Sequence, residues 1–334
     1  MAKDKLANVS ETSKHLIDKV NKSVDSASAE ELVFLASALN TAKTHVIPER
    51  NEELFDKVGT STWIVPEDVE SFCAVLVGGG GGGAQSWAHY GGNGGALAYA
   101  NNIKVEPGDK VTVVVGKGGQ AYNQNGGSTY IQLNGQTLFT AEGGSANGTT
   151  PAKPKNGSIS CQGGAGGIRT HSGSWQDGGG GAGGYSGQGG KGVYGGTAGA
   201  GQGGGGGGGA GYESSTYGFG GGGGVGLYGI GSNGTGGTTP GNSWYNSART
   251  GGKGGSGGFP GAGNCNGTEQ VTDGFGNSMT VYHGQGGKYG GGGAGAGSSQ
   301  SNNSNFGHGG QGGARIIWGE GMSFPNNAQR VSVK

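Results

Sequence analysis

The spacing of apolar residues divides the chain into three stretches. Apolar side chains recur at intervals of three and four in residues 1–58 and in short alternating runs in residues 62–141, whereas over much of the remainder non-glycine residues recur at every third position. Intervals of three and four indicate amphipathic helices, whereas alternation indicates strands that bury one face. The pattern predicts a mainly β chain with short N-terminal helices and a third kind of structure after the strands.

Residues 1–58 are predicted to form a helical segment for attachment or oligomerisation. A capping box, Ser28 to Glu31, precedes the second helix, and Pro48 is placed to start a third short one. The apolar seam is narrow, which suits association with copies of the same chain, as a homotrimer, or with a larger particle. A helical hairpin folded onto its own domain is the alternative. The predicted oligomerisation residues are Leu16, Val20, Leu32, Leu35 and Leu39.

Seven short runs rich in β-branched and aromatic residues are predicted strands. Asn134-Gly135 is a hairpin signal between two of them, and Pro107-Gly108-Asp109 supplies turn chemistry between two others. Because a lone strand needs a sheet to complete, the last run predicts that the chain returns to a β-sandwich built from residues 59–145 and 314–320. The runs are residues 62–66, 71–77, 96–105, 110–116, 128–133, 136–141 and 314–318.

Residues 146–313 are glycine-rich, and the whole chain has 89 glycines in 334 residues. Three residues per turn is the period of polyproline II, a helix without internal hydrogen bonds, whose backbone groups must bond neighbouring segments or water. With glycine on two of three faces, backbones can approach closely, and we predict a bundle of packed polyglycine helices. The non-glycine residues that keep this period after Gly181 are Ala182, Tyr185, Gln188, Lys191, Tyr194, Thr197 and Ala200.

Two other interpretations compete for the glycine-rich composition. Collagen requires abundant proline beside glycine at every third position, and this chain has only 8 prolines. A flexible low-complexity linker is the usual meaning of such composition. The period of three, the flanking strands and a charged fraction of 13% favour order instead.

Aromatic and polar segments interrupt the glycine runs, at residues 84–90, 168–177, 212–219, 238–250, 264–283 and 298–306. In a rigid bundle they are the turns at its two ends, where Trp, Tyr, Ser and Asn offer contact area and adaptable hydrogen bonds, as in antibody paratopes. The alternative is that these aromatic rings only cap the bundle against water. The candidate receptor-binding residues are Trp87, His89, Tyr90, Trp175, Tyr212, Tyr217, Trp244 and Tyr245.

Charge and motifs narrow the function. Basic and acidic residues number 21 each, so no cationic field favours nucleic acid, and no run of about 18 apolar residues could insert into a membrane. Cys73, Cys161 and Cys265 are widely spaced, which indicates neither a disulfide framework nor a zinc site. Walker, HExxH, GxSxG and EF-hand motifs are missing from the sequence. We expect no enzymatic activity, no catalytic residues, no cofactor and no metal.

Four stretches carry a family resemblance: TWIVPEDVESFCAVLVGGGGGG, VEPGDKVTVVVGKGGQ, NGGSTYI and GHGGQGGARIIWGEGMSFP. In this order, across residues 62–325, they resemble the glycine-rich domain at the ends of tailed-bacteriophage fibres. The resemblance implies a β-sandwich with glycine-rich insertions in a virion protein that touches the host. The alternating glycine and aromatic segments are also similar to the receptor-recognising adhesins of T-even-type long fibres, where polyglycine helices form a sandwich and the segments between them bind the host.

The resemblance implies a virion tail fibre or tail-tip protein, made in the host cytoplasm. It would attach through its N-terminus to other tail or baseplate proteins and present a receptor-binding end to a host glycan or outer-membrane protein. Residues 321–334 are expected to be a C-terminal tail. The alternative function is a purely structural tail or baseplate component with the bundle as a rigid spacer. A depolymerase spike would need clustered carboxylates on a long β-helix, and the sequence has no such repeat.

Overall fold

A computed structural model describes the chain in nine ranges: residues 51–83, 90–120, 123–170, 177–211, 220–239, 250–263, 268–282, 284–295 and 307–329. The chain divides into two compact units, Met1–Glu49 and Arg50–Lys334, and all of these ranges belong to the second. Across them the regular structure is strand alone, so this region is mainly β as predicted. The first two predicted N-terminal helices and the seam of Leu16, Val20, Leu32, Leu35 and Leu39 lie outside the described residues.

One sheet joins the beginning and the end of the second unit. Its strand order is β1-β13-β3-β4, and all neighbouring strands are antiparallel. The last strand of the chain, β13, therefore lies between the early strands β1 and β3. This confirms that the run at residues 314–318 completes a sheet begun early in the chain. The four strands are β1 (Asn51–Phe55), β13 (Gly313–Trp318), β3 (Ser71–Val77) and β4 (Leu97–Lys104).

A second, antiparallel sheet has the order β2-β5-β6-β7-β8. Its first four strands match predicted runs to within a few residues, and the Asn134-Gly135 hairpin joins β6 to β7 with both residues at positive φ. Pro107-Gly108-Asp109 lies in the connection between β4 and β5. The strands are β2 (Gly59–Ile64), β5 (Lys110–Val115), β6 (Thr129–Leu133), β7 (Gln136–Ala141) and β8 (Pro154–Asn156).

Strand β3 reads as a continuous apolar run because it is buried on both faces. Phe72, Ala74 and Leu76 point into a core that both sheets share. The alternate residues, among them Val75 and Val77, point into a second core formed with the glycine-rich region and the C-terminal residues. Successive side chains of a strand point to opposite faces, so this one strand supplies both cores.

The period of three in the glycine-rich region has a packing reason. Ala182 and Tyr185 are buried in the second core, whereas Gln188 and Lys191, later in the same phase, are exposed. The Tyr185 ring stacks on Phe324 with ring centroids 6.1 Å apart. This part of the region is thus fixed to the first sheet by the few large side chains that the glycine runs carry.

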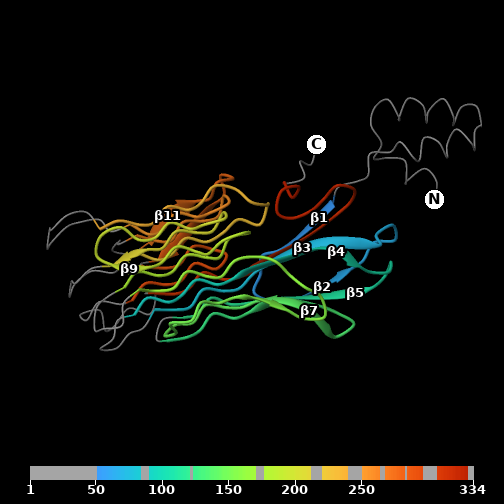
Figure 1. The fold of residues 1–334 in the computed structure, drawn as a ribbon, viewed down its shortest axis with the longest axis horizontal. Helices are drawn as coiled ribbons and strands as arrows, with labels where there is room; N and C mark the ends of the chain where they lie inside the picture. Colours follow the sequence, from blue (N-terminus) through green and yellow to red (C-terminus); the bar gives the residue numbers. More distant parts are fainter. Residues whose placement is uncertain are drawn as a thin grey trace, which may run out of the picture. The chain divides into compact units, whose positions relative to one another are not determined.

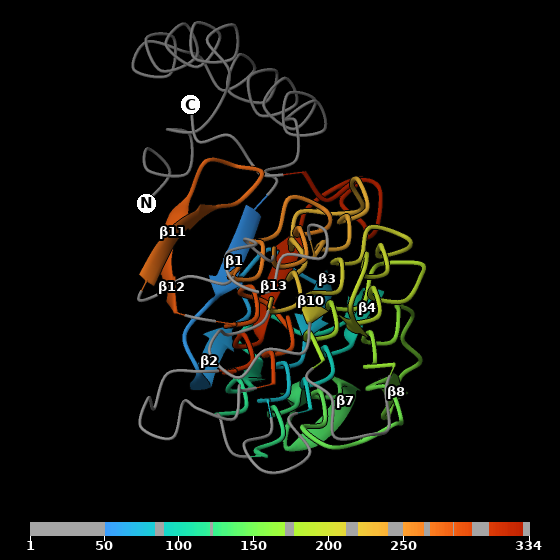
Figure 2. The same cartoon turned by 90° about the vertical axis from the view of Figure 1, so that its left-hand side faces the viewer.

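Backbone hydrogen bonds link the glycine segments in directions that repeat every third residue. In the segment after β3, amides three residues apart donate to the same neighbouring segment. Residues 78 and 81 donate to residues 96 and 93. Residues 79 and 82 donate to residues 127 and 124, and residues 80 and 83 donate to residues 310 and 307. Residues 92–97, 178–183 and 220–225 follow the same rule with other neighbours. Figure 1 shows these segments running side by side away from the sheets, and Figure 2 views them along their length.

Glycine is required here because backbones approach one another closely. A Cβ atom built on Gly206 would overlap the carbonyl oxygen of Gly223, and one on Gly207 the carbonyl oxygen of Thr235. The obstacle in both cases is backbone, which cannot rotate away as a side chain can. Gly204–Gly209, most of the seven-glycine run, are buried.

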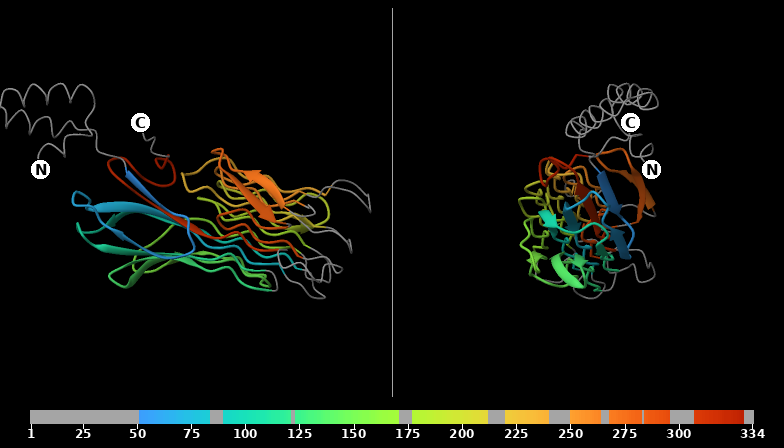
Figure 3. Two further views of the ribbon diagram at one scale, coloured as in Figure 1. Left: turned by 180° about the vertical axis from the view of Figure 1, so that it is seen from behind. Right: turned by 90° about the vertical axis from the view of Figure 1, so that its right-hand side faces the viewer.

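Two predictions of local structure were wrong. The third short helix after Pro48 is contradicted because Asn51–Phe55 is strand β1, which pairs with β13 along its length and buries Phe55. Residues 264–283 were predicted to be a bundle turn, but they contain the hairpin of β11 (Thr268–Thr272) and β12 (Ser278–Tyr282). Val271 and Val281 pack on Phe259 and Ala262, so the hairpin has a small core of its own. Figure 3 shows it from behind, lying along the glycine segments.

Further differences are smaller. The expected C-terminal tail is packed over its described residues, because Met322, Phe324 and Ala328 are buried in the second core. The sequence pattern did not predict β1, the short β8, or the two-residue strands β9 (Val193–Tyr194) and β10 (Ala210–Gly211). Strands of two or three residues carry too little pattern for recognition, whereas the five residues of β1 have a composition that also suits a helix.

Candidate functional site

The glycine-rich region has two unlike ends. At the end next to the sheets, here called the proximal end, the chain reverses within a few residues. Ser256 and Tyr289 are turn residues there with positive φ angles of 48° and 64°, each followed by a glycine with positive φ. Gly290 lies against Val77, the last residue of β3. The opposite end, here called the distal end, is where the chain leaves for its long interruptions.

The residues that flank the aromatic interruptions are hydrogen-bonded to one another or to shared neighbours. The Gly295 amide donates to the Asp177 carbonyl at 3.1 Å, which joins the flanks of two interruptions. The Thr239 hydroxyl donates to the Gly211 carbonyl at 3.2 Å, which joins two more. The distal end is defined by Gly83, Tyr90, Thr170, Asp177, Gly211, Gly220, Thr239, Thr250, Gly295 and Gly307.

Most of the predicted recognition residues belong to segments whose two flanks lie at this distal end. The flanks of residues 84–89, 171–176, 212–219, 240–249 and 296–306 all converge there. The prediction placed the interruptions at both ends of the bundle, whereas the flanks of these segments gather at one. The candidate residues Trp87, His89, Trp175, Tyr212, Tyr217, Trp244 and Tyr245 themselves lie outside the described residues.

Tyr90 is the candidate that the structure places. Its half-buried ring packs against Arg169, with the guanidinium carbon 3.6 Å from the ring centroid. The Arg169 side chain also donates to the Asn147 carbonyl at 3.1 Å. A cation over a partly desolvated tyrosine face is worth about 1–2 kcal/mol. Tyr90 thus has a structural role at the base of the distal end.

Asn93 organises the same place and was missed by sequence reasoning. Its side chain is fully buried, accepts from the Arg169 amide at 3.2 Å, and donates to the Gly148 and Thr150 carbonyls. The signal for it was available, since Asn93 stands alone among glycines in the run GGNGG. A single amide side chain inside a glycine run fits a position that must satisfy several backbone groups.

Thiols and metal-ligating side chains add no further candidate site among the described residues. Burial raises the pKa of the Cys73 thiol and that of Cys161, and neither forms a disulfide in the described chain. Within the nine described ranges no three His, Cys, Asp or Glu side chains gather as a metal site. Over the same ranges no helix is long and apolar enough to cross a bilayer.

Comparison with known proteins identifies a family for this chain. A comparison with curated protein sequences finds no match. A family model described as a glycine-rich domain matches residues 56–268, which is more than half of the chain. The match begins just after β1 and ends at β11, so it covers most residues of both cores and most of the glycine-rich region, but not β13. The chain therefore belongs to the glycine-rich domain family.

Proposed function

We propose that the protein is a tail fibre or tail-tip protein of a tailed bacteriophage, carried on the virion, and that its distal end binds the host surface. The observation that carries this proposal is the convergence of the interruption flanks at one end of the glycine-rich region. Segments rich in Trp, Tyr, Ser and Asn that share one base can form a single contact surface. Such residues combine large contact area with adaptable hydrogen bonding.

The proposal includes a rigid support, in which the glycine segments are packed polyglycine II helices beside a β-sandwich. The three-residue repeat of hydrogen-bond directions supports the helices, since polyproline II geometry turns once every three residues. The core shared by the two sheets supports the sandwich. Recognition segments on a rigid scaffold lose less entropy on binding than segments on a loose one.

The direction of strand β1 also suits a protein that presents its distal end to a receptor. Strand β1 brings the chain in with Asn51 opposite Trp318, and runs toward the glycine-rich region with Phe55 opposite Ala314. The chain therefore enters at the end of the sheet remote from the glycine-rich region. We propose that residues 1–47 of the predicted N-terminal segment attach the protein to other tail or baseplate proteins and form a homotrimer. Removing them should lower the mass measured by light scattering to that of a monomer.

The partner proposed for the distal end is a host cell-surface glycan or outer-membrane protein. A spacer without a ligand is the second function. For Tyr90 alone the spacer function is favoured, because its ring packs against Arg169 and so stabilises the base of the distal end. Neither function requires an enzyme, a cofactor or a nucleic acid.

The proposal is tested by locating the protein and blocking its site. Electron cryomicroscopy of the particle, with an antibody fragment against residues 240–249, should show the label at the outermost point of a fibre or tail tip. The same fragment should prevent adsorption to host cells, and a fragment against the β2–β5 sheet should not. A label found inside the tail tube, or adsorption that both fragments leave intact, would contradict the proposal.

A further inference from the structure

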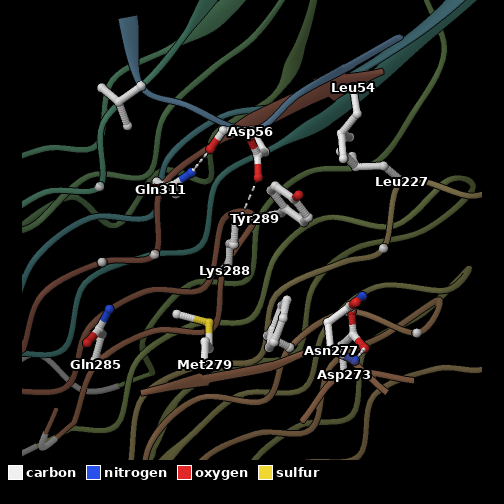
Figure 4. Close-up of a pocket in the computed structure, with 18 of the residues that line it drawn as sticks. Leu54, Asp56, Leu227, Asp273, Asn277, Met279, Gln285, Lys288, Tyr289 and Gln311 are labelled. Atoms are coloured by element: carbon white, nitrogen blue, oxygen red, sulfur yellow. Dashed lines mark hydrogen bonds and ion pairs between the residues drawn. The ribbon is translucent and has the colours of Figure 1, made fainter. Parts of the chain in front are cut away.

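A groove separate from the distal end lies between β1, the proximal turns and the β11–β12 hairpin. Its volume is about 690 Å³, a size typical of small-molecule sites. In Figure 4, Asp56 and Gln311 lie along one side and Gln285, Met279 and Asn277 along the other, with Lys288 and Tyr289 between them. Polar and aromatic groups from three different regions of the chain therefore face one space.

Phe275 is fixed in this groove by the hairpin turn. Asp273 Oδ1 accepts from the backbone amides of Phe275 and Asn277 at 2.9 and 2.8 Å, and Gly276 adopts a φ of 84°. The Phe275 ring meets Tyr228 edge to face with centroids 4.9 Å apart, yet the residue remains 42% exposed. An exposed ring held by its own backbone is a preorganised stacking surface.

Tyr289 also lines the groove, where Figure 4 draws it between the two sides. Its positive φ is uncommon for a bulky residue, and its ring lies so close to Gly313 that a Cβ there would collide with it. Residues held in such conformations often belong to functional sites. Burial raises its pKa, and the negative charges of Asp56 and Asp273 add to the increase. The hydroxyl is protonated at neutral pH, as in any tyrosine, and can both donate and accept a hydrogen bond.

The groove carries balanced charge. Asp56 and Asp273 are matched by Lys117 and Lys288, and Lys288 Nζ lies 3.2 Å from Asp56 Oδ2. A charged ligand would gain little net attraction in such a site. Gln285 Oε1 accepts from the Tyr282 amide and Gln311 Nε2 donates to the Asp56 carbonyl, so these two side chains offer a ligand the Gln285 amide nitrogen as donor and the Gln311 amide oxygen as acceptor.

We propose that this groove binds a neutral saccharide. The apolar C–H face of a sugar ring can stack on Phe275, while its hydroxyls meet carboxylate, amide and tyrosine groups that each suit a neutral polar partner. The inference does not depend on the function proposed for the distal end, because the groove shares none of the residues that define that end.

The test uses the full-length protein with maltotriose, lactose, mannotriose and diacetylchitobiose, measured by saturation-transfer NMR and calorimetry. At least one sugar should bind with a Kd of about 1 mM or tighter. Phe275→Ala should weaken that binding by about tenfold and Asp56→Asn by about fivefold. The matched control is Tyr282→Ala, because Tyr282 is 43% exposed on the same hairpin but lies outside the groove.

Three results would overturn the proposal: no binding by any of the four sugars, binding that Phe275→Ala and Asp56→Asn leave unchanged, or equal weakening by Tyr282→Ala. Thermal melting of each variant checks folding. If Phe275→Ala melts early, Asp56→Asn decides the question alone, since Asp56 is partly exposed at the groove rim. Loss of sugar binding with host adsorption intact would separate the groove from the distal end.

Discussion

Glu52 and Arg315 form an ion pair that joins the first and last strands of the second unit. The Arg315 side chain is fully buried, and its Nε donates to Glu52 Oε2 at 2.9 Å. The same guanidinium donates to the carbonyls of Leu227 and Ala328, and it lies over the Tyr228 ring at 4.5 Å. One side chain thus connects the first sheet, the glycine-rich region and the C-terminal residues.

Glu52→Gln should lower the free energy of unfolding by about 3 kcal/mol, because it leaves a buried guanidinium without its counter-charge. Denaturant unfolding followed by circular dichroism measures the change. The control is Lys155→Gln, which breaks the exposed pair of Lys155 with Glu142 and should cost less than about 1 kcal/mol. Equal losses for the two variants would show that burial of Arg315 has no energetic weight.

Gly207→Ala should destabilise the protein by about 3 kcal/mol or more, since the added Cβ overlaps the Thr235 carbonyl oxygen and must push neighbouring backbones apart. Gly206→Val together with Gly207→Val should prevent folding. The matched control is Gly135→Asn, at an exposed turn position where a Cβ meets nothing and Asn tolerates the φ of 80°. If Gly207→Ala melts with the parent protein, the seven-glycine run is a loose linker.

The glycine amides of residues 78–83, 178–183 and 220–225 should exchange slowly with solvent, because each donates to a neighbouring backbone carbonyl. Residue-resolved hydrogen exchange by NMR should find them protected at least about a hundredfold relative to a free chain. The exposed turn glycine Gly135 serves as the unprotected reference. Free exchange throughout the three segments would contradict lateral hydrogen bonding.

Stability should fall as the pH rises above about 10. Burial raises the pKa of Tyr185 and that of Tyr289, so the folded state keeps both hydroxyls protonated where the unfolded chain ionises them. The folded state then binds more protons, and unfolding becomes easier by up to about 1.4 kcal/mol per pH unit for each tyrosine. Urea titrations from pH 8 to 12 measure this slope. Tyr185→Phe and Tyr289→Phe together should reduce it, and an unchanged slope would assign the effect to other groups.

The sheets could be predicted from sequence because their strands carry strong local patterns. The run SFCAVLV is apolar on both faces and is strand β3 to the residue. The hairpin at Asn134-Gly135 needs φ angles that these two residues adopt readily. The return of ARIIW to the first sheet followed from the need of a lone strand for partners.

Other features depend on contacts that the sequence does not display. Strand β1 has the composition NEELF, which also suits a helix, and only pairing with β13 decides its form. The role of Arg315 depends on residues 88 and 263 positions away in sequence. The interruption flanks gather at one end because each glycine segment forms backbone hydrogen bonds with particular neighbouring segments. Glycine has no side chain, so the sequence does not show which segments become neighbours.

The most direct test of the central proposal measures adsorption to host cells by particles that carry single alanine substitutions. The substituted residues are Trp175, Tyr212, Tyr217, Trp244 and Tyr245, one in each variant. The flanks of these residues' segments converge at the distal end, so we expect a few substitutions to weaken binding by about 2 kcal/mol or more while the melting temperature stays within a few degrees of the parent. Tyr282→Ala is the control for loss of an exposed ring elsewhere. If every substitution lowers the melting temperature and none alters adsorption, these aromatic residues cap a structural spacer and the distal end is not the receptor-binding site.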